Sequence, residues 1–331
     1  MGMNTILVTG GAGFIGSSLV DKLLEKGNKV VVIDNFNDYY DPKLKERNIM
    51  DIMKNMDKLN MDHDNLKIYR QDIRNAIKTD EVLKNYKIDI IIHLAAMAGV
   101  RYSIEAPQIY YDVNVNGTLN LLECVRKNNI KKLIFGSSSS IYGNNKKIPF
   151  SEDDSVDHPI SPYAASKKAC ELLCYAYHYL YDIDIACLRF FTVYGPRQRP
   201  DLAIHKFTKA IILEETVPIY GNGLTERDYT YIDDIVDGIM KTINWIKKED
   251  NRYEIFNLGE SRTIPLNEMV AIIEKILCKK ANTYHFPMQD GDMERTFADI
   301  SKASKFLGYF PNKTFEDGVA EFIKWFEAIL V

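Results

Sequence analysis

Short apolar segments recur along the first 190 residues and alternate with longer segments in which apolar side chains return every three or four positions. The short segments are rich in Ile and Val, which is typical of strands that are buried on both faces. They are Thr5–Thr9, Lys29–Ile33, Leu66–Gln71, Ile88–His93, Lys132–Phe135 and Ile183–Leu188. The longer segments have helical spacing and include Ile15–Lys26, Ala76–Tyr86 and Thr118–Lys127. This alternation predicts an α/β fold with a Rossmann-type, doubly wound parallel sheet.

The pattern changes after about residue 190, where loops rich in Gly, Pro, Asp and Arg separate the helical segments. Those segments are Lys206–Glu214, Asp233–Lys247, Pro265–Leu277 and Phe315–Ala328. We therefore expect a nucleotide-binding domain over residues 1–190 and a smaller substrate-binding lobe over 191–331. A segment near 227–257 is expected to return to the first domain. The polar stretch Asn48–Asp64 is expected to be a surface helix and loop.

A glycine-rich string, Gly10-Gly11-Ala12-Gly13-Phe14-Ile15-Gly16, joins the first predicted strand to the first predicted helix. Such a loop lets the backbone approach a pyrophosphate, and the helix N-terminus offers it free N–H groups. Asp34 ends the next strand, where a carboxylate bonds two ribose hydroxyls and repels a 2′-phosphate. These features favour NAD over NADP as the cofactor. Asp72 suits either the adenine amino group or a turn at the end of a strand.

Tyr163 and Lys167 lie four residues apart after the helix-start signal Ser161-Pro162 and share one helix face. An ammonium beside a phenol favours the phenolate, which can take a proton from an alcohol. The serine run Ser137–Ser140 offers a hydroxyl for the same point. The combination indicates an enzyme in which a nicotinamide takes the hydride while the tyrosine takes the proton.

Composition narrows the possible partners and the compartment. The net charge of −4, without a dense basic run, argues against a nucleic-acid surface. No apolar stretch approaches the ~20 residues that cross a bilayer, so no membrane partner is expected. Five cysteines form no paired CxxC units, so no metal is expected, and a reducing cytoplasm is favoured. Cys170, Cys174, Cys187 and His93 are interpreted as core residues.

Taken in order, these motifs resemble the extended short-chain dehydrogenase/reductase family, and within it the UDP-glucuronate 4-epimerases. The shared strings are the glycine loop, Asp72, His93–Ala96, Asn114–Thr118, the serine run before Tyr142-Gly143, and the Tyr163/Lys167 pair. The more specific strings are Asp34–Pro42, Ala98–Ser103, Leu188–Pro200 and Arg227–Asp234. The resemblance covers nearly the whole chain. It implies a UDP-sugar substrate and an NAD-dependent isomerase that interconverts UDP-glucuronate and UDP-galacturonate through a 4-keto intermediate.

The resemblance also implies site residues. Ser138, Tyr163 and Lys167 are the implied catalytic residues. The implied cofactor contacts are Gly10, Gly13, Phe14, Ile15, Gly16, Asp34, Asn35, Asp72, Ile73, Leu94, Ala95, Ala96, Asn114, Tyr163 and Lys167. The implied substrate contacts are Arg101, Ser138, Ser139, Ser140, Thr192, Arg197, Arg199, Arg227 and Asp292. Arg227 is expected at the diphosphate and Asp292 near the uridine ribose, whereas the role of each other arginine is open.

Several alternatives share this scaffold. A UDP-glucose or N-acetylhexosamine 4-epimerase usually has an asparagine at the position of Thr192. Sugar-nucleotide dehydratases carry acidic residues where this chain has Ser139 and Ser140, and UDP-glucuronate decarboxylases usually carry a glutamate at the position of Ser140. A serine cannot replace a carboxylate base. An NAD-binding regulator without activity is disfavoured by the intact catalytic residues. A homodimer is expected through the helices around 119–125 and 169–179, although a buried helix of a monomer would look the same.

Overall fold

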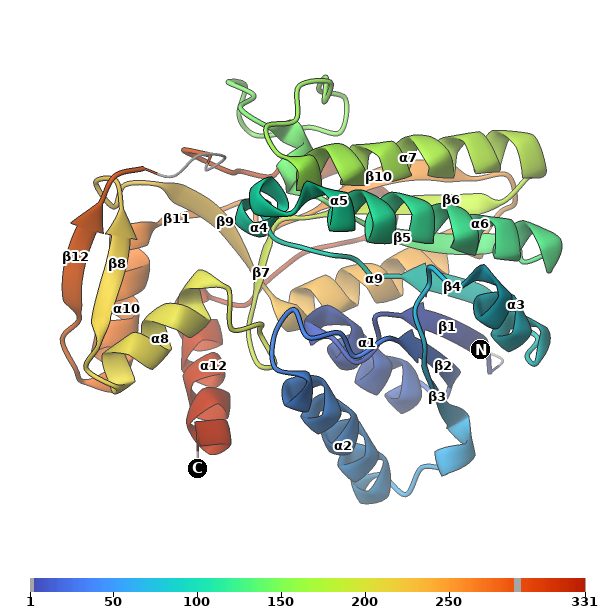
Figure 1. The fold of residues 1–331 in the computed structure, drawn as a ribbon, viewed down its shortest axis with the longest axis horizontal. Coiled ribbons are helices and arrows are strands. Elements are labelled where there is room, and N and C mark those ends of the chain that lie inside the picture. Colours follow the sequence, from blue (N-terminus) through green and yellow to red (C-terminus); the bar gives the residue numbers. More distant parts are fainter. Residues whose placement is uncertain (1–2, 289–292, 331) are drawn as a thin grey trace.

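The computed structural model describes residues 3–288 and 293–330 and confirms the predicted α/β architecture. Within these residues, seven parallel strands form the central sheet in the order β10-β6-β5-β4-β1-β2-β3 (Figure 1). They are β1 (Thr5–Thr9), β2 (Lys29–Asp34), β3 (Leu66–Arg70), β4 (Ile90–His93), β5 (Lys132–Ser138), β6 (Asp184–Phe190) and β10 (Tyr253–Leu258). The order reverses between β1 and β4, and ligands bind at the carboxyl ends of strands beside such a reversal.

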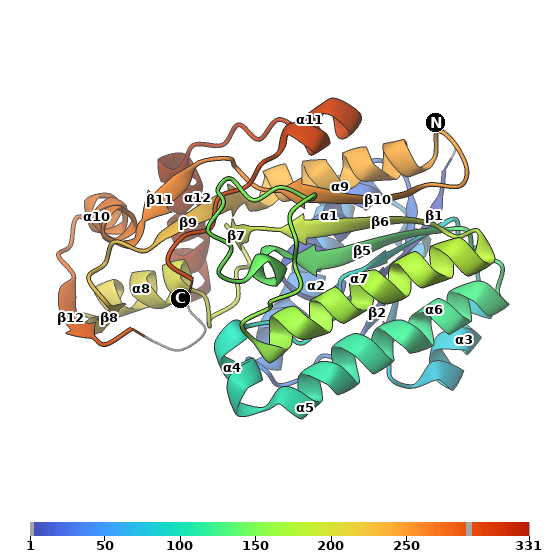
Figure 2. The same cartoon turned by 90° about the horizontal axis from the view of Figure 1, so that it is seen from above.

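Helices cover both faces of this sheet, so its strands are buried on both sides (Figure 2). On one face lie α1 (Phe14–Glu25), α2 (Pro42–Lys58) and α9 (Ile232–Ile246). On the other lie α3 (Ala76–Lys84), α6 (Gly117–Lys127) and α7 (Pro162–Tyr181). Cys170, Cys174 and Cys187 are buried in this second layer, which confirms their prediction as core residues. No helix of the described chain is long and apolar enough to cross a membrane.

Short helical segments connect the larger elements. They are η1 (His63–Asn65), α4 (Val100–Glu105), α5 (Pro107–Tyr110), the π-helix η2 (Tyr111–Asn116) and η3 (Ser139–Tyr142). The chain runs from α5 through η2 directly into α6, and η2 packs against α7. This continuous run of helix places α4 and α5 next to the start of α7 (Figure 2).

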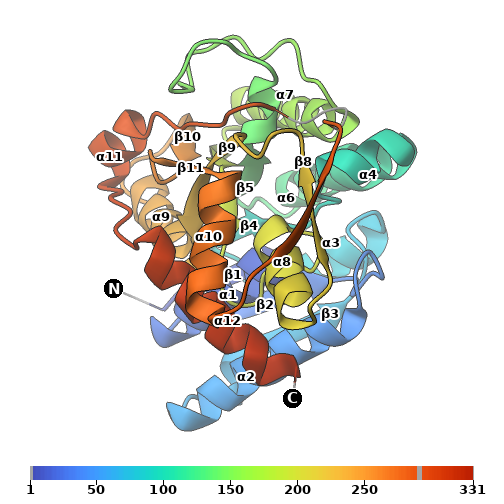
Figure 3. The same cartoon turned by 90° about the vertical axis from the view of Figure 1, so that its left-hand side faces the viewer.

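A smaller group of elements lies beyond the carboxyl ends of the large sheet and faces the viewer in Figure 3. In the described chain, β7 (Thr192–Tyr194), β9 (Glu226–Tyr231) and β11 (Thr263–Pro265) form one sheet, and β8 (Thr216–Tyr220) pairs with β12 (Asn282–Phe286). The helices here are α8 (Ala203–Ile212), α10 (Leu266–Leu277) and α12 (Phe315–Leu330), whereas α11 (Ser301–Leu307) packs against α9 and β10 of the large sheet. Helices α8, α10 and α12 were predicted from sequence, but α11, the small strands and strand β10 of the large sheet were not. The chain rejoins the large sheet at α9 and β10, whereas the proposed division at residue 190 stays a prediction.

The helix expected within Asn48–Asp64 starts earlier and is not confined to the surface. It begins at Pro42, because the Asp41 carboxylate caps the first turn by accepting from the Lys43 N–H at 2.9 Å. Ile52 is buried against the core, and Asn48 donates its amide Nδ2 to the Ala12 carbonyl at 2.9 Å. Helix α2 therefore supports the glycine loop directly, which its polar composition concealed.

His93 is a buried core histidine, as predicted. Its Nδ1 lies 2.7 Å from Thr9 Oγ1 and its Nε2 lies 2.9 Å from Thr118 Oγ1. Burial lowers the pKa of His93 to about 3, and the nearby charge of Lys167 adds to the effect. The imidazole is therefore neutral in the folded protein and bridges β1, β4 and α6 through two hydroxyls.

This neutral histidine makes stability depend on pH. Below its unfolded pKa of about 6.5, the unfolded chain binds a proton that the folded chain does not bind, so the free energy of unfolding falls as pH falls. Between pH 7.5 and 5.5 the contribution of His93 amounts to about 1.4 kcal/mol. Urea unfolding at both pH values should show a decrease in the free energy of unfolding that is smaller by this amount in His93→Gln than in the parent protein. An unchanged pH dependence would contradict the neutral state.

Candidate active site

One cleft at the carboxyl ends of the strands collects most of the residues that the sequence singled out. The predicted residues that line it are Gly10, Gly13, Phe14, Ile15, Gly16, Asp34, Asn35, Asp72, Ile73, Leu94, Ala95, Ala96, Ser138, Ser139, Ser140, Tyr163, Lys167, Thr192, Arg199 and Arg227. Candidate cofactor and substrate residues therefore face one continuous space. This placement lets a bound sugar and a bound cofactor meet.

The glycine loop is shaped by contacts that exclude side chains. Gly10 has a φ of +71°, and a Cβ atom there would lie 2.8 Å from the backbone nitrogen of Ala95. A Cβ atom at Gly16 would lie 2.1 Å from the carbonyl oxygen of Gly10. Gly13 precedes the first turn of α1, which has neither a side-chain cap nor an acidic residue. The uncapped N–H groups of α1 therefore fit the pyrophosphate of a dinucleotide.

Asp34 ends β2 and presents its carboxylate to the cleft. The carboxylate accepts from Ala12 N at 3.1 Å and from Phe36 N at 2.8 Å, so it also fixes the glycine loop. Burial raises the pKa of Asp34, and the two backbone donors and Lys45 partly oppose the rise. A carboxylate at this point of the fold suits the ribose hydroxyls of NAD.

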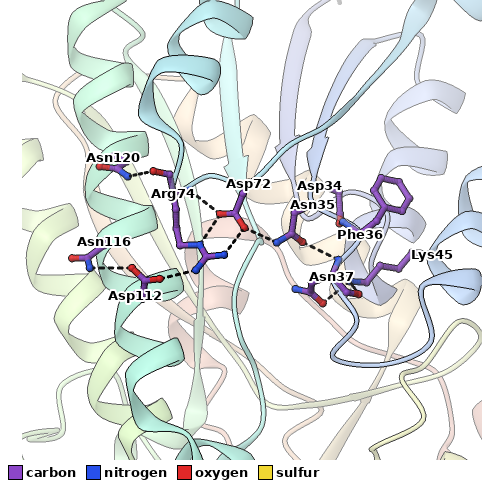
Figure 4. A network of polar contacts seen from close by, with 10 residues as sticks. All are labelled: Asp34, Asn35, Phe36, Asn37, Lys45, Asp72, Arg74, Asp112, Asn116 and Asn120. Atoms are coloured by element: carbon purple, nitrogen blue, oxygen red, sulfur yellow. Dashed lines mark hydrogen bonds and ion pairs between the residues drawn. The ribbon is translucent and has the colours of Figure 1, made fainter.

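Asp72 belongs to a polar network that Figure 4 shows from close by. Arg74 donates to both carboxylate oxygens, through Nε at 3.0 Å and Nη2 at 2.9 Å, and Asn35 Nδ2 donates at 2.7 Å. The Arg74 backbone N–H also donates to Asp72, at 2.9 Å, which is the turn-forming contact considered from sequence. Arg74 continues to Asp112 of η2 at 2.6 Å. Asp72 thus forms the turn, and its contact with adenine stays a prediction.

Gln71 is a cleft residue that the sequence analysis did not identify. Its Nε2 is buried and has no hydrogen-bond partner in the described part of the chain, although the residue lines the cleft beside Asp72. An orphaned donor at this position fits a ligand with acceptor atoms, such as an adenine ring. No local signal in the sequence distinguishes Gln71 from any other polar residue at a strand end.

Tyr163 and Lys167 occupy the first two turns of α7, as predicted. Ser161 caps this helix by accepting from Ala164 N at 3.2 Å, and Pro162 takes the first helical position. Lys167 Nζ donates to the Gly136 carbonyl at 2.7 Å, which holds the buried ammonium against β5. The Tyr163 ring packs edge-on against Tyr110, with ring centroids 6.0 Å apart. Both side chains are therefore fixed in orientation before any ligand binds.

The serine run turns from β5 into η3 at the cleft. Ser138 Oγ accepts from the Ser140 N–H at 3.2 Å and lies 3.1 Å from Ser140 Oγ, to which it donates. Ser139 and Ser140 also line the cleft, and Thr192 faces it from β7. Among the described residues that line the cleft, the carboxylates are Asp34 and Asp72, both near the glycine loop. The serine end therefore offers hydroxyl groups in place of a carboxylate base.

A buried ion pair holds these elements together. Glu171, one turn after Lys167 on α7, pairs with Arg189 of β6 through contacts of 3.0 and 2.9 Å, and both side chains are at most 2% exposed. Ser137 donates to Glu171 at 2.7 Å, and Arg189 donates to the Tyr142 hydroxyl at 2.9 Å. The network therefore links α7, β6 and the serine run.

The structure separates the candidate arginines. Arg199 lines the cleft and pairs with Asp201 through contacts of 2.9 and 2.7 Å, and Arg227 also lines the cleft. Arg197 instead points toward α1, where it pairs with Asp21 at 2.7 Å. Arg101 lies over the Tyr220 ring, 4.8 Å from its centroid, and is not part of the described lining.

Two further predicted residues need separate comment. Asn114 is not part of the described lining, because its amide exchanges hydrogen bonds with the Met97 backbone at 2.8 and 3.0 Å and donates to Ser166 at 2.9 Å. The amide therefore supports α7 through Ser166, and the contact of Asn114 with the cofactor stays a prediction. Asp292 lies outside the described residues.

Other lining residues were not predicted as site residues, although several fall within strings used for the resemblance. They include Tyr39, Tyr40, Lys45, Met97, Ala98, Gly99, Val100, Leu202, Met293 and Thr296. Gly99 is notable because its φ is +111°, and a Cβ atom there would lie 2.7 Å from the Tyr39 hydroxyl. Tyr39 and Tyr40 could have been identified from the sequence, because they fall within the unusual string Asp34–Pro42. Met293 and Thr296 could not, because they follow no motif.

The doubly wound sheet, the glycine loop, and the tyrosine and lysine beside a serine in one cleft define an NAD-dependent enzyme of the extended short-chain dehydrogenase/reductase class. The model of the GDP-mannose 4,6-dehydratase family matches residues 7–322. The chain therefore belongs to that family.

Curated relatives and solved structures match over nearly the whole chain. An uncharacterized protein of Methanocaldococcus jannaschii is 48% identical, over 98% of this chain and 97% of its own length. A UDP-glucuronate 4-epimerase of Thermodesulfobacterium geofontis is 43% identical, over 98% of this chain and 96% of its own. The crystal structure of UDP-glucuronic acid 4-epimerase from Bacillus cereus, in complex with UDP-glucuronic acid and NAD, is 36% identical with a TM-score of 0.88. That match covers 98% of this chain and 99% of the other.

Removal of one charge from the buried ion pair should destabilise the fold strongly. Glu171→Gln leaves the Arg189 guanidinium buried without its counter-charge, which costs about 3–5 kcal/mol. The matched control is Glu25→Gln, which breaks the exposed pair with Lys22 and costs about 1 kcal/mol or less. Unfolding of both variants in guanidinium chloride measures the difference between their losses in the free energy of unfolding. Equal losses of stability would show that the buried pair contributes no more to the free energy of unfolding than the exposed pair does.

Proposed function

We propose that this chain is an NAD-dependent 4-epimerase that interconverts UDP-glucuronate and UDP-galacturonate. The observation that carries the proposal is the placement of Ser138, Tyr163 and Lys167 in the cleft that also holds the glycine loop, while the neighbouring serines offer no carboxylate base. The relatives whose names specify UDP-glucuronate 4-epimerase activity match the chain from end to end. The reaction class is therefore isomerisation at C4 of the sugar.

Bound NAD supplies a hydride acceptor, which takes the hydride of sugar C4 and returns it to the opposite face of the resulting ketone. Tyr163 acts as the base that removes the proton of the 4-hydroxyl and later returns it. Lys167 uses one ammonium proton on the Gly136 carbonyl, so two remain for the tyrosine and a ligand hydroxyl. Ser138 lines the same cleft, and its hydroxyl, which donates to Ser140 Oγ in this structure, is expected to turn to the sugar oxygen when the substrate binds.

Inversion at C4 requires the sugar ring to turn while the nucleotide stays bound. Strong contacts must therefore lie away from the reacting carbon. Arg227 on β9 lines the cleft and is the candidate anchor for the diphosphate. The cofactor side is separately anchored at α1, so the two ligands do not compete for one set of donors.

A uronic acid also needs protection, because its 4-keto form is a β-keto acid that can lose carbon dioxide. Ser139, Ser140 and Thr192 are the candidate donors to the sugar carboxylate. Ser140 Oγ accepts from Ser138, so its own proton is available to a carboxylate. Among the three arginines whose roles were left open, Arg199 is the candidate partner of the sugar carboxylate, because it lines the cleft. Arg197 pairs with Asp21 and Arg101 lies over the Tyr220 ring.

The exposed apolar face of α7 supports a homodimer. Leu172, Tyr175 and Tyr179 repeat at helical spacing and are 58%, 53% and 75% exposed. Tyr111 of η2 and Leu119 of α6 extend the face. We include in the proposal a second copy of the chain as its partner, packed as a four-helix bundle. A cytoplasmic location is also part of the proposal, in keeping with the five free cysteines.

Sedimentation equilibrium tests the dimer. The protein should sediment as a dimer, and the double variant Leu172→Glu, Tyr179→Glu should sediment as a monomer, because buried unpaired charges oppose association. Leu213→Glu, an exposed position on the other lobe, is the control and should remain dimeric. A monomeric parent protein would contradict this part of the proposal.

The first test of the function is incubation of the purified protein with UDP-glucuronate and no added NAD, followed by proton NMR. UDP-galacturonate should appear, and Tyr163→Phe should slow its formation by a factor of about 10²–10⁴. Release of carbon dioxide with a pentose product would show a decarboxylase instead. Conversion of UDP-glucose alone would move the assignment to a neutral-sugar epimerase.

A further inference from the structure

Asp228 is a fully buried carboxylate next to a residue of the cleft wall. It follows Arg227 on β9, and alternate residues of a strand point to opposite sides, so Asp228 faces away from the cleft that Arg227 lines. Its relative exposure is 0%. An ionisable group is buried in this way only when its environment satisfies it.

Four donors satisfy this carboxylate. One oxygen accepts from Glu260 N at 2.7 Å and Thr230 Oγ1 at 3.3 Å. The other accepts from Ser261 N at 3.0 Å and Ala298 N at 3.1 Å. Three segments that are remote in sequence therefore meet at one side chain: strand β9, the loop after β10, and the chain near Ala298.

The backbone around the carboxylate is shaped for close approach. A Cβ atom at Gly259 would lie 2.5 Å from Ala298 Cβ and 3.1 Å from Asp228 Oδ2. Glycine is therefore required at 259 if the loop and the chain near Ala298 are both to reach Asp228. The burial of this group raises the pKa of Asp228 to about 6, with the backbone donors opposing the rise, so the carboxylate is ionised above neutral pH.

The segment held by Asp228 forms part of the cleft wall. Thr296 lines the cleft, accepts from Asp228 N at 3.2 Å and donates its own N–H to the Glu226 carbonyl at 3.1 Å. Arg295 pairs with Glu226 at 2.8 Å. Met293 also lines the cleft on the same stretch. Arg227 and Thr296 are thus held beside each other by backbone contacts along β9, and the Asp228 carboxylate fixes the same segment two residues later, at Ala298.

We propose that Asp228 is a positioning residue for the nucleotide end of the cleft: its carboxylate locks β9 to the 296–298 segment and so places Arg227 and Thr296 for a nucleoside diphosphate. The inference rests on the proposed function, because it takes the ligand to be a UDP-sugar. Asp228 itself touches no ligand and acts through Arg227 and Thr296, which line the cleft. The contribution is to binding and not to the proton transfer, since Tyr163 and Lys167 lie on a different element.

Asparagine at this position removes the lock with little change of shape. Each carboxylate oxygen accepts from two groups, so an amide in either orientation turns its NH₂ group toward at least one backbone N–H. That N–H loses its acceptor, and the three segments separate locally. We expect Asp228→Asn to weaken the binding of UDP about tenfold and to raise KM for UDP-glucuronate, with kcat within about twofold.

Asp234 provides a matched control. It is a buried carboxylate on α9 that accepts from two backbone amides, Asn312 N and Lys313 N, each at 3.2 Å. Neither of those residues belongs to the described lining of the cleft. Asp234→Asn should therefore lower the melting temperature as Asp228→Asn does but leave UDP binding unchanged.

Isothermal titration with UDP at pH 8, with thermal unfolding and steady-state kinetics on the same preparations, tests the proposal. Weaker UDP binding in Asp228→Asn alone supports it. Equal UDP binding by the parent protein and Asp228→Asn overturns the positioning role but leaves the proposed function intact. Equal weakening of UDP binding in Asp228→Asn and Asp234→Asn has the same meaning. Failure of the parent protein to bind UDP overturns the proposed function and this inference together. If Asp228→Asn does not fold, Gly259→Ala, which pushes on the same contact, decides by the same readout.

Discussion

The buried ion pair between Glu171 and Arg189 is the constraint on which the geometry of the cleft depends. Two charges at most 2% exposed stabilise a fold only when their remaining hydrogen-bonding groups are also satisfied. Ser137 and Tyr142 meet that condition, and both belong to the chain that forms the serine end of the cleft. The pair therefore does more than hold α7 against β6. It fixes the rotation of the helix and the path of the serine run, so that the Ser138 hydroxyl, the Tyr163 phenol and the Lys167 ammonium all line one cleft.

The cleft must accommodate two anionic ligands without forcing their charges together. The uncapped N-terminus of α1 follows the glycine loop, and Arg227 lines the cleft from β9. Arg199 lies over the Tyr39 ring, close to Lys45, which is also close to Asp34. The rest of the wall combines the hydroxyl groups of the serine run, Tyr163 and Thr192 with apolar side chains such as Leu94 and Phe190. Asp34 and Asp72 stay at the adenosine end, where hydroxyl and amino donors are expected to meet them. In the proposed function, the cofactor anchor at α1 and the diphosphate anchor Arg227 belong to different elements, as a rotating sugar requires.

The sequence predicted the features that have a local cause. The buried strands, the glycine loop, Asp34 and the capped start of α7 each follow from a few consecutive residues. The short strands β7, β8, β9, β11 and β12 escaped prediction because their pairing joins distant segments and their composition is mixed. The arginines show the same limit. Arg197 and Arg199 are two residues apart in one motif, yet Arg197 adopts a φ of +66° and turns toward Asp21, whereas Arg199 enters the cleft. No property of the side chains distinguishes them before the backbone is known.

Helix α7 carries Tyr163, Lys167 and Glu171 at equal spacings of four residues. The two proposed catalytic side chains and the buried Glu171 that anchors the helix therefore lie along one stripe of its surface. An α-helix turns about 100° per residue, and a single insertion between Lys167 and Glu171 would rotate the anchor off that stripe. Substitutions on the outer face of α7 leave the stripe intact, but a change in its length does not. Related enzymes of this scaffold can therefore diverge freely in the loops at either end of the helix. Within this span, we expect them to tolerate neither a gained nor a lost residue.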